Sequence, residues 1–323
     1  MRKYIAIILC LILGGVNASD SILGGFNVSA SDAGMHYYDS YDDCGGCSIV
    51  MPRFLPYRVY ASHLEGRGIG YNQGYSSIGL LYTPGLMFSN NIQAFVDVRA
   101  HIFNNGKPAA NAGFGVRYLD TCRNRVYGAN LYYDYRKAHH TNLSQIGFGL
   151  EYLGNCWDLR FNGYFPIESE VVYNRHRFHY PGDFFAECSN LERPLSGFDA
   201  EYGRPFWRKC SPCEFLEVYA AAGPYYYTAK INSNDGKSFW GVRGRVAAKF
   251  WDYIEIEART TYDKYFKCRG EGVITFSYPF GGCCEKTSCC NAMKCIAVQP
   301  VYRQEIIAVG KPCCHWRANF DGF

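Results

Sequence analysis

The feature that most constrains the fold is a long alternation of apolar residues with polar or small ones. It is clearest in YGANLYYDYRKAHHTNLSQIGFGLEYLGNCWDLRFNGYFPI, residues 127–167. Because successive side chains of a β-strand point to opposite faces, a period of two predicts strands with one apolar and one polar face. No amphipathic helical pattern of any length interrupts the series between about residues 56 and 280. The chain is therefore expected to be all-β.

Turn signals divide this region into twelve expected strands. The clearest hairpin turns are Asn104-Asn105-Gly106-Lys107 and Asn234-Asp235-Gly236-Lys237. Most of the strands are about ten residues or longer, which suits a tilted membrane crossing and is roughly twice the length usual in soluble proteins. They are expected near residues 56–66, 68–84, 91–104, 109–119, 125–136, 143–153, 156–165, 196–205, 213–228, 237–249, 252–263 and 268–280.

Charged residues lie on the polar face of these strands, with acids and bases in balance. In a secreted soluble sandwich that face would meet water, whereas in an outer-membrane barrel it lines the interior and the apolar face meets lipid. The composition, with 17% aromatic and only 19% charged residues, and aromatic clusters at strand ends favour a twelve-stranded antiparallel transmembrane outer-membrane β-barrel. The charges expected to line its lumen are Asp97, Arg99, Arg117, Asp134, Glu151, Asp158, Arg160, Arg243, Arg245, Glu255, Glu257 and Arg259.

The N-terminus is typical of a secretory signal peptide. A short basic stretch, residues 1–3, precedes an apolar core at residues 4–16, and small residues follow at the expected cleavage site. The expected organisation is a signal peptide at 1–18, a periplasmic segment at 19–55, the barrel at 56–282 and a Cys-rich tail or linker at 283–323. The net charge is +4, but the basic residues form no cluster along the sequence, so no nucleic-acid partner is expected.

Five consecutive segments stand out within the strand pattern: GFGVRYLD (113–120), GANLYYDYR (128–136), IGFGLEYLG (146–154), WDLRFNGYFPI (157–167) and ERPLSGFDAEYGRPF (192–206). Together they resemble the inverse autotransporter β-domain of the intimin and invasin type, over roughly residues 63–309. The resemblance implies a twelve-stranded outer-membrane barrel whose C-terminal linker passes through the lumen and exports an adhesive passenger. VYRQEIIAVGK (301–311) resembles the stretch after the family's last strand, but only PCCHWRANFDGF follows, so a barrel without a passenger is expected.

Cysteines are unusually frequent for that family and resemble those of the cross-linked envelopes of Chlamydia-like bacteria. Of 16 cysteines, 15 follow the expected signal peptide, in a compartment that permits disulfides. Barrel turns alternate between two ends, so Cys122, Cys156 and the Cys210/Cys213 pair should share the end where the last strand finishes. The resemblance makes this end periplasmic, and the long connection 168–195, which holds Cys188, extracellular. The disulfide candidates are Cys44, Cys47, Cys122, Cys156, Cys210, Cys213, Cys283, Cys284, Cys289, Cys290, Cys295, Cys313 and Cys314.

Four interpretations of these cysteines compete. A zinc site in CCEKTSCC is disfavoured because vicinal pairs are poor tetrahedral chelators. Catalytic redox through Cys44-Gly-Gly-Cys47 or Cys210-Ser-Pro-Cys213 would need a lowered thiol pKa, for which no helix N-terminus is evident. Two readings remain open: disulfides within the chain that fix the periplasmic rim, and disulfides to other Cys-rich envelope proteins. The odd number of cysteines supports the second.

No enzyme, cofactor or metal site is expected. His101, on the polar face beside Asp97 and Arg99, is better explained as a packed lumen residue than as a general base. The expected function is that of a structural or surface protein of a Gram-negative outer membrane, in contact with lipid. One alternative is a channel, which fails if residues 296–311 fill the lumen. The other is an adhesin that contacts a host surface through the 168–195 loop.

Overall fold

The structure, a computed structural model, describes residues 57–83, 91–120, 123, 125–154, 156–168, 171–179, 185–211, 214–228, 238–250, 253–280, 298–310 and 313–319. All of them belong to one compact unit, Val50–Phe323. No helix in these ranges is long and apolar enough to cross a membrane. The expected signal peptide and the 19–55 segment lie outside the described residues. So do nine cysteine candidates: Cys44, Cys47, Cys122, Cys213, Cys283, Cys284, Cys289, Cys290 and Cys295.

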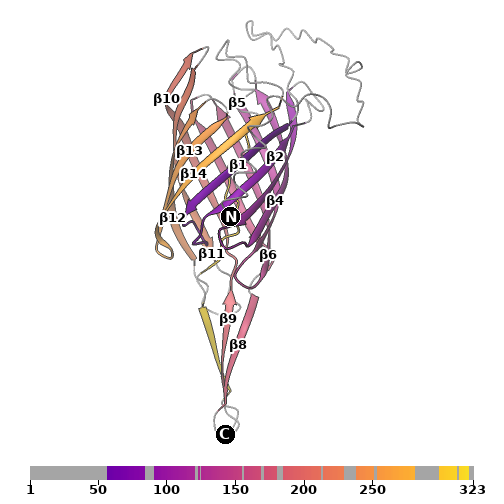
Figure 1. Cartoon of the computed structure of the whole chain (residues 1–323), viewed down its shortest axis with the longest axis vertical. Coiled ribbons are helices and arrows are strands. Elements are labelled where there is room, and N and C mark those ends of the chain that lie inside the picture. Colours follow the sequence, from indigo (N-terminus) through magenta and orange to yellow (C-terminus); the bar gives the residue numbers. More distant parts are fainter. Residues whose placement is uncertain are drawn as a thin grey trace, which may run out of the picture. The chain divides into compact units, whose positions relative to one another are not determined.

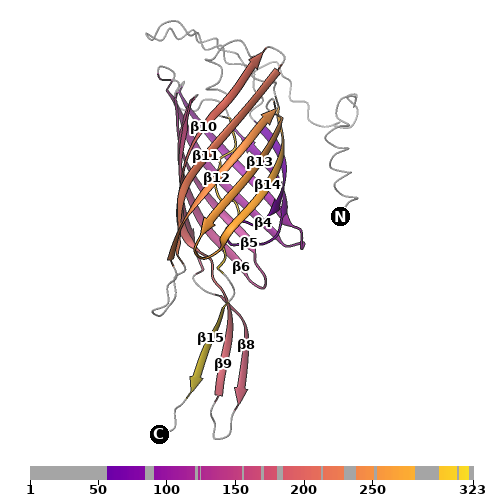
Figure 2. The same ribbon diagram turned by 90° about the vertical axis from the view of Figure 1, so that its left-hand side faces the viewer.

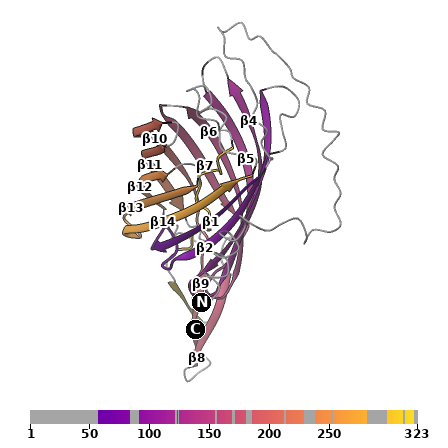
Figure 3. The ribbon, with the colours of Figure 1, turned by 45° about the horizontal axis from the view of Figure 1, so that its top comes forward.

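Twelve strands form a closed antiparallel barrel, in which β14 pairs back onto β1 (Figures 1 and 3). This confirms the expected fold, and each expected strand corresponds to an observed one. In chain order they are β1 (Tyr57–Gly66), β2 (Tyr75–Tyr82), β3 (Ile92–Phe103), β4 (Pro108–Asp120), β5 (Arg125–Lys137), β6 (Asn142–Gly154), β7 (Asp158–Pro166), β10 (Ser196–Ser211), β11 (Glu214–Thr228), β12 (Ser238–Phe250), β13 (Ile254–Asp263) and β14 (Lys267–Pro279).

The two faces of the barrel wall differ sharply in exposure. On β4, Phe114 is 61% exposed and Val116 is 49% exposed on the outside, while Arg117, the next residue of the strand, faces inward and is 0% exposed. The same alternation holds along β3, β5 and β6. An apolar outer face and a polar inner face are what a lipid environment requires of a closed sheet, since every backbone group is then paired within the wall.

The connection between β7 and β10 is a hairpin, not the loop that the sequence led us to expect. Strands β8 (Val171–His179) and β9 (Phe185–Glu192) pair with each other, and β15 (Cys313–Asn319) adds to β9, giving the order β15-β9-β8 (Figure 2). Most described side chains of β8 are exposed, so neither of its faces is apolar and the period of two is absent. The partner β15 lies more than a hundred residues later in the chain, where local patterns carry no information.

Strand β2 begins seven residues later than expected because residues 67–74 fold into the lumen. Gly66 and Gly70 have φ of 132° and 79°, a region that side-chain-bearing residues rarely adopt, so the chain turns inward there. Ile69 and Tyr71 are consequently buried, at 1% and 5% exposure. The Arg269 guanidinium of β14 donates to the carbonyls of Gly68 and Tyr71, each at 2.6 Å, and holds this turn in place.

The barrel has two ends, which we name by the strands that meet there. At the proximal end β1 begins, β14 finishes, and Cys156 lies between β6 and β7. At the distal end lie the turns 104–107 and 138–141 and the base of the β8–β9 hairpin. These names are used below without reference to membrane side.

A charge on the outer face tests the lipid-facing assignment. Leu150 is 53% exposed in the central part of β6, so Leu150→Arg should lower the free energy of unfolding by about 2–4 kcal/mol in lipid vesicles. Leu150→Val keeps the site apolar and serves as the matched control. Urea titration of the refolded barrel measures both, and equal stabilities of the two variants would contradict the assignment.

Candidate functional site: the segment inside the barrel

The C-terminal part of the chain returns through the lumen, along residues 298–310. The Gln299 carbonyl accepts from Arg117, near the proximal end of β4, at 2.7 Å. The Arg303 guanidinium contacts Asp134, further along the wall, and the Ile307 carbonyl accepts from Arg136, near the distal end of β5, at 2.5 Å. Successive residues thus contact positions progressively nearer the distal end. We call 298–310 the threaded segment.

A bidentate ion pair joins Arg303 of the threaded segment to Asp134 of the wall. Both guanidinium Nη atoms donate to the two carboxylate oxygens, each at 2.6 Å, and the Asp134 side chain is 0% exposed. Asn111 and Gln145 donate to the same carboxylate at 2.7 and 2.9 Å. The Arg303 guanidinium also lies 4.4 Å from the centre of the Tyr132 ring. A bidentate, fully hydrogen-bonded pair of this kind is the geometry that makes a buried charge tolerable.

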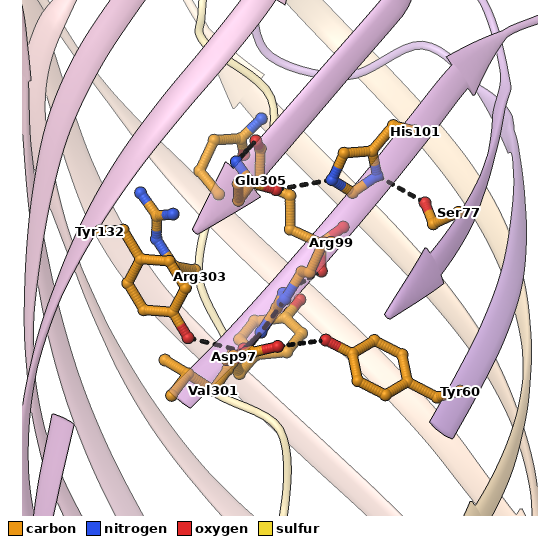
Figure 4. Close-up of polar contacts among 12 residues, drawn as sticks. Tyr60, Ser77, Asp97, Arg99, His101, Tyr132, Val301, Arg303 and Glu305 are labelled. Carbon is orange, nitrogen blue, oxygen red and sulfur yellow. Dashed lines mark hydrogen bonds and ion pairs between the residues drawn. The ribbon is translucent and has the colours of Figure 1, made fainter. Parts of the chain in front are cut away.

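A second group of charges lies on β3, two strands away from β5 in the barrel wall (Figure 4). The Arg99 guanidinium donates to Asp97 from Nε at 3.1 Å and from Nη2 at 2.5 Å, and to the Val301 carbonyl at 2.7 Å. It also pairs with Glu305 of the threaded segment. The Asp97 carboxylate accepts from two hydroxyls as well, Tyr60 at 2.7 Å and Tyr132 at 2.8 Å. Arg99 therefore joins the wall to the threaded segment at two points.

His101 completes this part of the wall. Its ring nitrogens are 2.6 Å from Ser77 Oγ and 2.6 Å from Asn111 Oδ1 (Figure 4). Asn111 in turn donates to the Glu305 backbone carbonyl at 2.8 Å. Both ring nitrogens have wall partners, so His101 is held as a packed lumen residue.

The opposite side of the barrel contacts the threaded segment through Tyr302 and Gln304. The Tyr302 ring contacts two guanidinium groups, with the Arg245 carbon 3.7 Å and the Arg259 carbon 5.2 Å from its centre. Its hydroxyl donates to Glu257 at 3.1 Å. Arg243 donates to the Gln304 side chain at 3.0 Å. Cation–π contacts of this kind gain strength where water is excluded.

Apolar side chains of the threaded segment fill the remaining space. Val301, Ile306, Ile307 and Ala308 are 0–2% exposed, and each belongs to a cluster with wall residues. Val301, for example, packs with Phe95 and Leu81. A cavity of about 160 Å³ remains on the side of β1, β13 and β14, lined by residues such as Arg58, Lys249 and Glu255. The threaded segment is therefore packed against the wall around most of its circumference.

The structure places all twelve charges expected in the lumen on the inner wall, buried or half-buried. Seven touch the threaded segment: Arg99, Arg117, Asp134, Arg243, Arg245, Glu257 and Arg259. Four pair with other wall residues: Asp97, Glu151, Asp158 and Arg160. Glu255 lines the cavity.

Several lumen residues were missed by the sequence reasoning. Asp199 and Glu201 of β10 are buried at 4% and 5% and pair with Arg243 and Arg245. The alternation in FDAEY, residues 198–202, carried the signal that could have found them. Tyr132 and other inward tyrosines were harder to predict. Their aromatic rings suggest a side chain that faces lipid, although their buried hydroxyls donate hydrogen bonds inside the lumen.

The described cysteines are divided between the two barrel ends. Cys156 is an exposed free thiol at the proximal end, where the C-terminal half of β10 also places Cys210. Cys268 is an exposed free thiol near the distal end of β14. Cys188 on β9 is disulfide-bonded. Candidates Cys313 and Cys314 begin β15, so they lie at the distal end and apart from Cys156.

Comparison with known proteins adds a family and a fold. Residues 85–219 match the family described as "Inverse autotransporter, beta-domain". A solved structure from work on the in-meso crystallization of membrane proteins has a TM-score of 0.54 at 19% identity, covering 78% of this chain and 99% of that chain. This likeness supports the barrel fold. No curated protein sequence matches the chain.

Two further solved barrels show weaker likeness. An outer-membrane channel from Pseudomonas putida F1 has a TM-score of 0.41 at 10% identity, covering 69% of this chain and 94% of that chain. The β-domain of the Bordetella autotransporter BrkA has a TM-score of 0.32 at 12% identity, covering 69% and 98%.

The Arg303–Asp134 pair should be a main source of the barrel's stability. Arg303→Gln leaves the Asp134 carboxylate buried without its counter-charge, so we expect a loss of about 3–5 kcal/mol in the free energy of unfolding. The matched control is Arg123→Gln, because Arg123 is 77% exposed and lies 3.9 Å from Asp120; its effect should stay within about 1 kcal/mol. A similar loss in both variants, measured by denaturant titration in detergent, would show that the buried pair has no special role.

Proposed function

We propose that the chain, whose residues 85–219 match the inverse autotransporter β-domain family, is an outer-membrane anchor for its own C-terminal segment. In this proposal the barrel holds the threaded segment in its lumen. The distal end faces the cell exterior and presents the sheet formed by β8, β9 and β15. The protein then acts as a structural surface component of the envelope.

The observation that carries the proposal is the complementarity between the threaded segment and the barrel wall. Arg303 and Glu305 are charged, and each meets an opposite charge on the wall, Asp134 and Arg99. Backbone carbonyls of the segment accept from Arg99, Arg117 and Arg136. Burial of charge on this scale is costly unless it is paired, so the wall charges are matched to a resident segment.

Contacts at the distal end support the display of the C-terminus there. The backbone amide of Leu195 donates to Ala308, and that of Gly310 donates to Arg193, both at 2.8 Å. Glu192 at the end of β9 accepts from the backbone of His139 at 2.8 Å and from the Thr141 hydroxyl at 2.5 Å. The base of the β8–β9 hairpin is thus tied both to the emerging segment and to the turn after β5.

The proximal end, by contrast, is where we propose disulfide stabilisation or cross-linking in the periplasm. Cys156 is exposed and free there, and the Cys-rich stretch 283–295 joins the proximal end of β14 to the start of the threaded segment. An exposed thiol in an oxidising compartment is a ready partner for another envelope protein.

The two alternatives fare differently. A channel needs open space through the lumen, whereas the threaded segment packs against the wall on most sides. An adhesin that acts through residues 168–195 remains compatible with the fold, because the described side chains at 174–179 on β8 are exposed at the distal end. In that alternative the partner is a host surface.

Bilayer conductance distinguishes the anchor from the channel. The full chain should give no stable open-channel steps, while a chain ending at residue 297 should conduct, because the space of residues 298–310 is then filled with water. A chain ending at residue 312 loses β15 but keeps the threaded segment, so it should stay closed. Equal conductance of the full chain and the 297 variant would favour the channel.

Cross-linking is tested on outer membranes from cells whose free thiols have been blocked before lysis. On gels without reductant we expect high-mass bands that collapse to the monomer when reductant is added. Cys156→Ser should weaken at least one of these bands, while Cys268→Ser, which removes an exposed thiol at the distal end, should leave them unchanged. A monomer in both lanes would confine the disulfides to one chain.

A further inference from the structure

We propose that Cys188 and Cys314 form a disulfide that fastens the end of the threaded segment to the distal sheet. The inference rests on the threading that also carries the proposed function, but it concerns a different pair of residues. Its starting observation is that Cys188 is buried, at 9% exposure, and disulfide-bonded. The strand register then identifies the second cysteine.

Strands β9 and β15 place Cys188 and Cys314 on one face of the sheet. In their antiparallel pairing Cys188 lies opposite Trp316 and Asn190 lies opposite Cys314. Residues directly opposite share a face, and so do residues two apart on one strand. Cys188 and Cys314 are therefore diagonal neighbours on the same face of the sheet.

Other cysteines of the described chain are poorly placed to be the partner. Cys313 lies opposite Leu191, which puts it on the other face of the sheet from Cys188. Cys268 and Cys156 are free thiols. Cys210 lies near the proximal end of β10, whereas the β8–β9 hairpin leaves the barrel at its distal end. Among the cysteines that lie in the described ranges, Cys314 combines the distal end with the face that Cys188 occupies.

The chemistry is an exchange with an external disulfide. Deprotonation of the two thiols provides thiolates, one of which attacks the external disulfide to form a mixed disulfide. That attack releases one external thiolate. The second cysteine thiolate then attacks the protein sulfur of the mixed disulfide and displaces the other external thiolate, so the Cys188–Cys314 bond forms and the external disulfide is reduced to two thiols, which take up the two protons. A small-molecule or protein disulfide of the oxidising compartment serves as this oxidant.

The consequence of the bond is topological. It joins β9, which precedes β10 in the barrel wall, to β15, which follows the threaded segment. The covalent loop from residue 188 to residue 314 therefore contains strands β10 to β14 and the whole passage through the lumen. With the bond closed, the threaded segment is unable to slide back toward the proximal end. In the reduced protein only non-covalent contacts resist that movement.

Peptide mapping of the full chain from thiol-blocked outer membranes tests the bond. Trypsin does not cut before proline, so it should release peptide 178–208 with Cys188 and peptide 304–317 with Cys313 and Cys314. We expect the two peptides as one linked species that separates on reduction. Cys314→Ser should abolish the species and Cys313→Ser should leave it intact. Survival of the link in Cys314→Ser, or a link from Cys188 to any other peptide, overturns the proposal.

A second readout separates this inference from the proposed function. Antibody binding to an epitope added at the C-terminus of the full chain, on intact cells, reports whether the C-terminus is displayed. A linked peptide pair with an inaccessible epitope would refute the display and leave the disulfide standing. An accessible epitope without the linked pair would refute the disulfide and leave the display standing.

Discussion

A charged group inside a membrane barrel needs a partner, because lipid surrounds the wall and little water remains within it. The architecture of this protein follows from that constraint. The acids and bases of the inner wall form pairs such as Arg117–Glu151 and Arg245–Glu201. Where the wall does not balance itself, as at Asp134, the threaded segment supplies the counter-charge. The lumen is thus completed by a part of the chain that belongs to no barrel strand.

The sequence predicted those features that depend on local pattern. A period of two in hydrophobicity indicates a strand with one apolar face. Each of the twelve barrel strands has an apolar face against lipid, so all twelve strands were predicted. Strands β8 and β9 were not predicted because their hairpin has no apolar face and so no period of two. Residues 67–74 were wrongly included in a strand for another reason. The alternation appears continuous there, but the chain turns into the lumen at Gly66 and Gly70.

For the candidate site, the sequence predicted which side chains line the lumen but not which of them contact one another. The alternation showed which charges point inward, but it gave no means to decide which of them meet residues 298–310. Arg303 and Asp134 are separated by 169 residues, and their pairing depends on barrel closure and on the path of the threaded segment. Tyrosines were misjudged for a chemical reason: Tyr60 and Tyr132 act through hydroxyls that hold Asp97, a role that their hydrophobicity conceals.

The spacing of contacts along the threaded segment has a consequence for the length of chain that emerges. Residues 299, 303 and 307 meet Arg117, Asp134 and Arg136, while residues 301 and 305 both meet Arg99. The apolar Ile306 and Ile307 follow directly after the charged Glu305. A shift by one residue in either direction would place an uncharged side chain against Asp134. The contacts in the lumen therefore fix the register of the threaded segment against the wall, and this register sets the residue at which the chain leaves the barrel.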